Sequence, residues 1–209
     1  DYLSMIHQGR RLAAFLHLSS DDVLINLFPL SPMPNVGYLL VPAKGAGLAL
    51  PVVDAIPGSP YRPYPVTHTA DLCADIINRH KGTLLWGVSS FVRKVIMRAQ
   101  EYRLDFSRVR IVILAGETVP VEMAADVSAR LSELGAPHAR VLRSYGFTEL
   151  QGGLLECAPE SGFHCLSPEE VYLEIVDPVT HAPLPEGEEG LVVLTHLDRR
   201  GTVLLRYAT

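Results

Sequence analysis

Apolar residues along the first part of the chain alternate between helical spacing and short continuous runs. From Tyr2 to Leu18 they roughly follow the helical period, and Val23–Phe28 is an apolar run of strand length. The alternation then repeats with a helix after Thr69, a strand at Thr83–Trp86, a helix at Phe91–Tyr102, a strand at Val109–Leu114, a helix from Pro120 to Gly135 and a strand at Ala139–Leu142. Strands that alternate with helices of this length predict an α/β fold with a mostly parallel sheet flanked by helices.

Several residues mark where the predicted helices begin or end. Thr69 is expected to cap one helix, and Ser89 or Ser90 the next, because their hydroxyl oxygens accept hydrogen bonds from the free N–H groups of a first turn. Pro120 is expected at the first helical position of the following helix, and Gly135 just beyond its end.

The pattern changes towards the C-terminus. Val171–Val176 and Leu191–Leu197 are rich in apolar and β-branched residues and are separated by turn residues, which predicts strands. Earlier, Asn35–Leu50 is glycine-rich and ambiguous between helix and loop, whereas the four prolines of Pro57–Pro65 predict a surface connection. We expect a single domain with an α/β portion at 1–165 and a β-rich portion at 166–209.

The composition excludes some classes of function. The chain has 209 residues, of which 48% are hydrophobic and 20% are charged, as expected for a globular protein with an apolar core. The formal net charge of -5 argues against nucleic acid as the main partner, because binding to a phosphate backbone requires a basic face. The apolar stretch Asn26–Ile56 is broken by prolines and charges, so it falls short of the roughly 20 apolar residues of a membrane span.

The two ends of the chain look like the ends of a fragment. The chain starts at Asp1 without Met or the features of a signal peptide, and it stops just after a predicted strand at Val203–Tyr207. We therefore expect a fragment that is truncated at both ends.

The cysteines indicate the cellular compartment. The three cysteines form an odd set without the spacing of a disulfide framework, which favours a reducing cytoplasm.

The segment Ser144–Glu149 carries the clearest candidate chemistry. It follows a predicted strand, so it lies at the carboxyl end of a parallel sheet, where open α/β folds bind their ligands. Tyr145 offers an aromatic face to a purine, and Gly146 lets the backbone approach it. Thr148 offers a hydroxyl to a phosphate and Glu149 a carboxylate to Mg²⁺. Taken alone, the segment also fits an ordinary turn that closes a strand.

A second strand end lies about thirty residues upstream. Leu114-Ala115-Gly116-Glu117 ends the preceding predicted strand, and Gly116 lets a flat ring lie against the backbone. Neighbouring parallel strands deliver their carboxyl ends to the same edge of a sheet. We therefore predict that Tyr145 and Glu149 face the same crevice as Gly116.

These motifs, in this order, resemble the adenylate-forming (AMP-binding) superfamily. The resemblance extends from about Leu24 to Thr209 and rests on Ala115-Gly116-Glu117, Tyr145-Gly146-Phe147-Thr148-Glu149, Gly187-Glu188-Glu189-Gly190 with the strand Leu191–Thr195, and Arg206-Tyr207. Within the superfamily, the chain is similar to phenylacetate-CoA ligases through Glu156-Cys157, Glu174–Pro178 and Leu184–Glu188.

The resemblance implies part of the N-terminal domain of an acyl-CoA or aryl-CoA ligase. Such enzymes use ATP and Mg²⁺ to convert a small carboxylic acid into an acyl-adenylate, and then transfer the acyl group to a thiol such as CoA. We expect the family's phosphate loop, its ribose-binding Asp and its lysine-bearing C-terminal domain to lie outside this sequence, so this fragment alone is expected to be inactive. A homodimer is a further expectation.

The resemblance also assigns roles to residues. It implies a nucleotide site built from Ala115, Gly116, Glu117, Tyr145, Gly146, Phe147 and Thr148. Tyr145 would pack on the adenine. Thr148, at the phosphate, and Glu149, on Mg²⁺, would be the catalytic residues.

Two weaker hypotheses concern other residues. Phe28 and Trp86 are candidates for the acyl pocket, because a flat aryl acid packs well on aromatic rings, although both residues also fit a buried core. Cys157, His164 and Cys165 lie close together in the sequence and are candidate Zn²⁺ ligands, although their spacing matches no closed four-ligand motif.

Two rival functions remain. The chain could be a nucleotide-binding or small-molecule-binding module without catalysis, as expected for a degenerate copy of an enzyme. An oxidoreductase-type nucleotide domain is disfavoured, because no glycine fingerprint opens any predicted helix.

Overall fold

The computed structural model describes residues 2–28, 51–55 and 69–208. The segments Asn35–Leu50 and Pro57–Pro65 lie outside these residues. The helices are α1 (Tyr2–Leu16), α3 (Ala70–His80), α4 (Ser89–Glu101) and α5 (Val121–Glu133). The strands are β1 (Leu24–Leu27), β2 (Val52–Asp54), β3 (Leu84–Val88), β4 (Ile111–Ala115), β5 (Arg140–Tyr145), β6 (Leu154–Glu156), β7 (Phe163–Cys165), β8 (Val171–Val176), β9 (Leu191–His196) and β10 (Tyr207–Ala208).

Most of the described strands form one sheet. The order in this seven-stranded sheet is β2-β1-β3-β4-β5-β6-β7. Strands β1 to β5 pair in parallel, whereas β6 pairs antiparallel with both β5 and β7. The predicted α/β fold with a mostly parallel sheet is therefore confirmed, and the antiparallel extension is a feature that the sequence pattern did not indicate.

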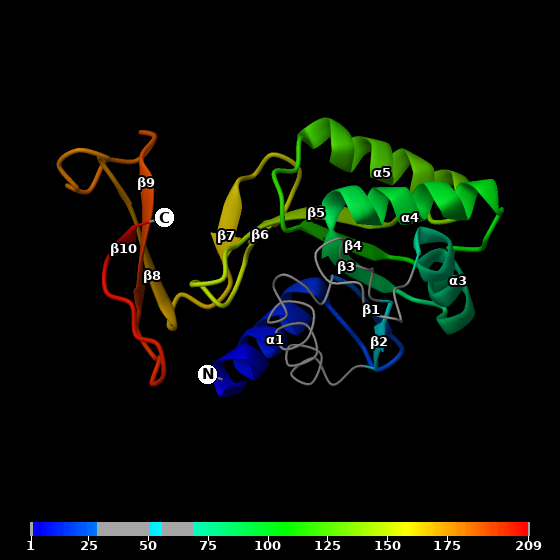
Figure 1. Ribbon diagram of the computed structural model, residues 1–209, viewed down its shortest axis with the longest axis horizontal. Helices are drawn as coiled ribbons and strands as arrows, with labels where there is room; N and C mark the ends of the chain where they lie inside the picture. The colour runs from blue at the N-terminus through cyan, green and yellow to red at the C-terminus, as the bar shows by residue number, and fades with distance from the viewer. Residues whose placement is uncertain (1, 29–50, 56–68, 209) are drawn as a thin grey trace.

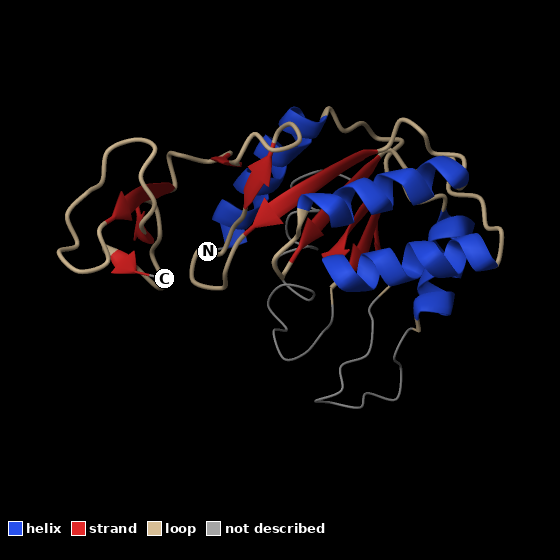
Figure 2. Cartoon of the chain, turned by 90° about the horizontal axis from the view of Figure 1, so that it is seen from above, coloured by secondary structure: helices blue, strands red, loops and turns tan. Residues whose placement is uncertain are grey.

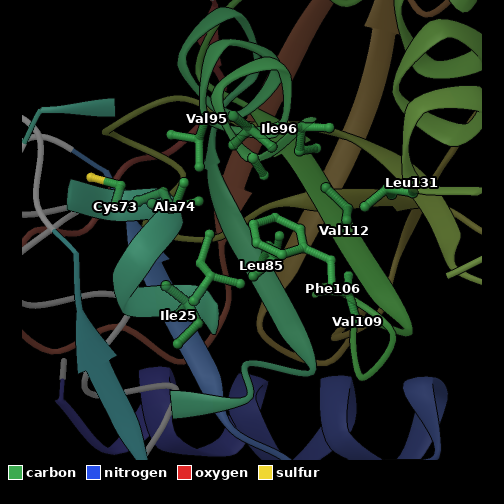
Figure 3. Close-up of a cluster of buried hydrophobic side chains, with 14 of the residues drawn as sticks. Ile25, Cys73, Ala74, Leu85, Val95, Ile96, Phe106, Val109, Val112 and Leu131 are labelled. Atoms are coloured by element: carbon green, nitrogen blue, oxygen red, sulfur yellow. The ribbon is translucent and has the colours of Figure 1, made fainter. Parts of the chain in front are cut away.

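Helices cover both faces of the parallel strands. Figures 1 and 2 show α3, α4 and α5 on one face and α1 on the other. The strand register places Ile25, Leu85 and Val112 side by side under the first group of helices, where they pack with Phe106 and α4 (Figure 3). Because both faces are buried, the central strands are continuously apolar instead of alternating.

The β-rich portion forms a separate three-stranded antiparallel sheet, in the order β10-β9-β8. Figure 1 shows it to one side of the larger sheet, beyond β7. A small apolar cluster joins Leu150 and Leu154 to Val171 on β8 and Leu194 on β9. The last strand is shorter than the expected Val203–Tyr207 and comprises Tyr207–Ala208.

The helix starts agree only in part with expectation. Thr69 caps α3 as predicted, since its hydroxyl oxygen accepts the N–H of Leu72 at 3.2 Å. The prediction of Ser89 or Ser90 as a cap is wrong, because both lie inside α4 and Val88 is the N-cap residue. Pro120 is itself the N-cap of α5, one position before its expected place.

A buried carboxylate joins the amino-terminal ends of the parallel strands. Asp22 is 2% exposed and precedes β1. Its Oδ1 accepts hydrogen bonds from Thr83 Oγ1, before β3, and from Arg110 Nε, before β4, both at 2.7 Å. Its Oδ2 accepts the N–H of Ser19 at 2.8 Å. The segments that precede β1, β3 and β4 are distant in sequence, and these hydrogen bonds hold them together at the amino-terminal ends of the three strands.

These donors determine the ionisation of Asp22. Burial alone would raise its pKa, but the hydrogen bonds from Arg110, Ser19 and Thr83 stabilise the carboxylate and lower the pKa to about 2. The unfolded value is about 3.9. The stabilisation is therefore complete above the unfolded pKa and is lost as the pH falls from about 4 towards 2.

In the described part of the chain, no helix is both long and apolar enough to cross a membrane.

Replacing Asp22 by Asn should lower the free energy of unfolding at pH 7 by about 2–3 kcal/mol, because charge-assisted hydrogen bonds are lost at a buried site. Chemical denaturation measured from pH 7 to pH 2 tests this. The difference from the unmodified protein should shrink as the pH falls from about 4 to about 2, because the Asp22 carboxyl of the unfolded chain takes up a proton first and the native carboxylate does so only near its own pKa of about 2. The matched control Asp21→Asn removes an exposed neighbouring charge and should change stability little. Equal effects of the two substitutions would contradict the role assigned to Asp22.

Candidate functional site

Both candidate ligand segments begin at neighbouring strand ends. In the parallel register, Val88 at the end of β3 pairs with Ala115 at the end of β4, and Leu114 pairs with Arg143 on β5. The segments at 115–117 and 144–149 therefore leave the same edge of the sheet. This is the edge where open parallel sheets bind ligands.

The β4 end is linked to the first turn of α4. The carbonyl oxygen of Ala115 accepts the hydroxyl of Ser89 at 3.1 Å. The carboxylate of Glu117 accepts the backbone N–H of Ser90. A carboxylate at a helix N-terminus is favoured by the helix dipole and replaces the side-chain cap that Val88 cannot provide. Glu117 thus has a structural role that the sequence did not indicate.

Gly116 lies in a position that requires glycine. Its φ of +80° is in the left-handed region, which side chains with a Cβ rarely adopt. A Cβ at this position would lie 3.4 Å from Val88 Cγ2 and 3.6 Å from Phe28 Cε1. The Gly116 backbone is therefore close to one of the two predicted acyl-pocket residues.

Tyr145 belongs to a partly exposed aromatic cluster at the end of β5. Its ring is 38% exposed, and its centroid lies 6.0 Å from that of Phe147 and 5.9 Å from that of Phe163 on β7. Phe163 is itself 44% exposed, and the guanidinium carbon of Arg143 lies 5.9 Å from the centroid of its ring. Tyr145 is therefore partly accessible, and an accessible aromatic ring can stack on a flat ligand.

The turn after Tyr145 is closely packed. A Cβ on Gly146 would lie 2.8 Å from the carbonyl oxygen of Gly152, so close backbone contact requires glycine here. Phe147 packs against the apolar cluster of Leu150, Leu154, Val171 and Leu194, between the two sheets. The carbonyl oxygen of Thr148 accepts the N–H of Gln151 at 3.1 Å, which closes the turn.

Glu149 is exposed at the tip of this turn. Its Oε1 accepts the phenolic hydroxyl of Tyr207, on β10, at 3.3 Å. A partly engaged but exposed carboxylate is suited to binding a cation, because its remaining lone pairs are accessible.

A buried ion pair supports the end of β5. Arg143 donates to Glu156 on β6 from Nε at 2.9 Å and from Nη2 at 2.5 Å, and Glu156 is 2% exposed. The hydrogen bonds from Arg143 lower the pKa of Glu156 and outweigh the opposing effect of burial. Nothing in the sequence marked this pair, because the two residues are brought together by the antiparallel strand that the pattern did not indicate.

The two acyl-pocket candidates form part of the core. Phe28 is 5% exposed and Trp86 is 8% exposed, and their ring centroids lie 6.2 Å apart in an edge-to-face arrangement. Trp86 borders a cavity of about 50 Å³ beneath α1, which Leu12, Ile113 and Ser144 also line. A cavity of about 150 Å³ is known to bind benzene. As defined by the described residues, the space beside Trp86 is smaller than an aromatic ring requires.

The candidate zinc ligands form no metal site in the part of the chain that the structure describes. Within residues 2–28, 51–55 and 69–208, no group of three or more His, Cys, Asp or Glu side chains is placed to hold a metal ion. His164 and Cys165 are consecutive on β7, so their side chains point to opposite faces.

The placement of Tyr145, Glu149 and Gly116 around one crevice stays a prediction.

Comparison with known proteins identifies the family. The AMP-binding enzyme family model matches residues 7–196. A curated relative, the phenylacetate-coenzyme A ligase of Pseudomonas putida, is 29% identical over 104 residues, which are 49% of this chain and 22% of that ligase.

Solved structures share the fold. A 2-hydroxyisobutyryl-CoA ligase in complex with 2-HIB-AMP and CoA matches 100% of this chain and 42% of its own, at 19% identity and a TM-score of 0.79. A long-chain-fatty-acid-CoA ligase from Archaeoglobus fulgidus matches 91% of this chain and 37% of its own, at 15% identity and a TM-score of 0.69. The chain thus spans less than half the length of these relatives. With most of its residues matched by the family model, the chain belongs to the AMP-binding enzyme family.

Proposed function

We propose that the complete protein uses ATP and Mg²⁺ to convert a carboxylic acid into an acyl-adenylate and then transfers the acyl group to the thiol of CoA. The observation that carries this proposal is the emergence of 115–117 and 144–149 from adjacent parallel strands at one edge of the sheet. Family membership supports the reaction class. The 29% identity to a phenylacetate-coenzyme A ligase supports an aryl acid as the substrate.

The proposed reaction places specific demands on the site. Attack of a carboxylate on the α-phosphorus brings two anions together, so catalysis depends on positioning and on neutralising charge. Glu149 would hold Mg²⁺ through its exposed carboxylate, and the hydroxyl of Thr148 would donate to a phosphate oxygen. These two residues would hold the triphosphate in line with the attacking oxygen.

The same edge would bind the base. Adenine would stack on the exposed face of Tyr145, beside the backbone of Gly146 and Phe147, with Ala115 and Gly116 on the opposite side. Glu117 would contribute its backbone to the pocket, because its carboxylate caps α4. Phe28 would line the acyl side, since its ring lies close to Gly116, and Trp86 would pack behind it.

Replacing Glu149 by Ala should reduce acid-dependent pyrophosphate release about 100- to 1,000-fold, the range seen when one group that stabilises a transition state is removed. The assay uses the complete protein with ATP, Mg²⁺ and a panel of aryl and aliphatic acids. Aryl acids should give the highest kcat/KM. The matched control Glu188→Ala removes an exposed carboxylate from the turn before β9 and should retain activity. If the folded protein binds ATP but releases no pyrophosphate with any acid, it is a binding module and not a ligase.

Replacing Tyr145 by Ala should raise the KM for ATP about 5- to 150-fold, because stacking of a base on an aromatic ring contributes about 1–3 kcal/mol. Tyr145→Phe keeps the ring and should stay within about threefold of the unmodified protein. Tyr172→Ala removes a more exposed tyrosine on β8 and serves as the control. Steady-state kinetics with ATP as the varied substrate provide the measurement. An unchanged KM for ATP in Tyr145→Ala would remove Tyr145 from the adenine site.

A further inference from the structure

Arg199 is a buried cation in the connection between β9 and β10. Its side chain is 7% exposed, and burial lowers its pKa. Nη1 donates to the side-chain oxygen of Gln151 at 3.0 Å, whereas Nε and Nη2 are buried and have no hydrogen-bond partner among residues 2–28, 51–55 and 69–208. The negative charges of Glu170 and Asp198 favour its charged form. Burying a guanidinium with unpaired donors is unfavourable, so this placement needs a compensating reason.

Its partner Gln151 closes the turn that carries Thr148 and Glu149. The backbone N–H of Gln151 donates to the carbonyl oxygen of Thr148 at 3.1 Å. Gln151 also has a φ of +49°, a left-handed conformation that is unfavourable for a residue with a side chain. The hydrogen bond from Arg199 holds this side chain in place and so stabilises the strained closing residue of the turn.

A second contact reaches the same turn from the same chain segment. Tyr207, eight residues after Arg199, donates its hydroxyl to Glu149 Oε1 at 3.3 Å. One end of the segment 199–207 therefore contacts the last residue of the turn, and the other end contacts the proposed Mg²⁺ ligand. Between them, the N–H of Leu204 donates to the ring of the buried His196 at 3.3 Å, which ties the segment to β9.

We propose that Arg199 is a positioning residue that acts through Gln151 to fix the orientation of Thr148 and Glu149 towards the nucleotide phosphates and Mg²⁺. This inference rests on the proposed adenylation activity. A misplacement of about 1 Å in a reacting complex can reduce the rate about 100-fold, so a distant contact that fixes the turn affects catalysis without touching the substrate.

The test is a double-mutant cycle in the complete protein, with Arg199→Met, Gln151→Met and the double variant. Arg200→Met is the matched control, because it removes an adjacent but exposed arginine. The measurements are kcat for pyrophosphate release, the Mg²⁺ concentration that gives half-maximal rate, the KM for the acid and the thermal midpoint of unfolding.

Arg199→Met should reduce kcat about 10- to 100-fold, because the turn is no longer held in the reactive orientation. It should also raise the half-saturating Mg²⁺ concentration, while the KM for the acid stays within about twofold. The double variant should be no slower than Arg199→Met, since both substitutions remove the same contact. Arg199→Lys, which keeps the charge, should restore part of kcat.

The outcomes separate this inference from the proposed function. If the unmodified protein releases no pyrophosphate, the proposed function fails and this inference fails with it. If the unmodified protein is active, three results overturn the inference alone. These are an unchanged kcat and Mg²⁺ dependence in Arg199→Met, a loss of kcat no larger than that of Arg200→Met, and independent, multiplicative effects of the Arg199 and Gln151 substitutions. A loss of activity that only follows the thermal midpoint, with unchanged Mg²⁺ dependence, also overturns it.

Discussion

The carboxylate of Asp22 is the interaction on which the arrangement of the parallel strands depends. Parallel neighbours are joined by long crossovers, so no hairpin turn sets their register. Asp22 supplies that constraint by accepting hydrogen bonds from residues that precede β3 and β4, namely Thr83 and Arg110. Once the amino-terminal ends of β3 and β4 are level, their equal lengths of five residues bring their carboxyl ends level as well. Val88 then pairs with Ala115, and the segments at 115–117 and 144–149 leave the sheet at one edge.

Beyond β5, the parallel sheet continues into an antiparallel ribbon formed by β6 and β7. The ion pair between Arg143 and Glu156 joins β5 to β6 in a bidentate geometry. Pairing of β6 with β7 then brings Phe163 next to Tyr145. The partly exposed aromatic cluster of Tyr145 and Phe163 therefore depends on the ion pair that joins β5 to β6. Because Glu156 is almost completely buried, removal of either partner leaves an uncompensated charge.

Sequence periodicity predicted the elements that carry a strong local signal. The central strands are buried on both faces and are continuously apolar, and α3 begins at Thr69, whose hydroxyl caps it. Strands β6 and β7 are three residues each and have too short a pattern to recognise. The capping of α4 by Glu117 was also missed, because that carboxylate lies on another strand end, 27 residues beyond Ser90. Contacts between distant segments leave no periodic signal in the sequence.

The turn at 146–151 is contacted from two sides, by residues near α1 and by residues at the C-terminal end of the chain. On one side, Gly146 packs directly on Gly152, and a Cβ on Gly152 would lie 3.1 Å from the side-chain oxygen of Gln8 on α1. On the other side, Arg199 in the connection between β9 and β10 contacts Gln151, and Tyr207 on β10 contacts Glu149. A displacement of the smaller sheet would therefore move the Glu149 carboxylate relative to Tyr145, which is fixed by the larger sheet. The spacing between the Tyr145 ring and the Glu149 carboxylate thus depends on the packing of the two sheets, through the apolar cluster around Leu150 and Val171.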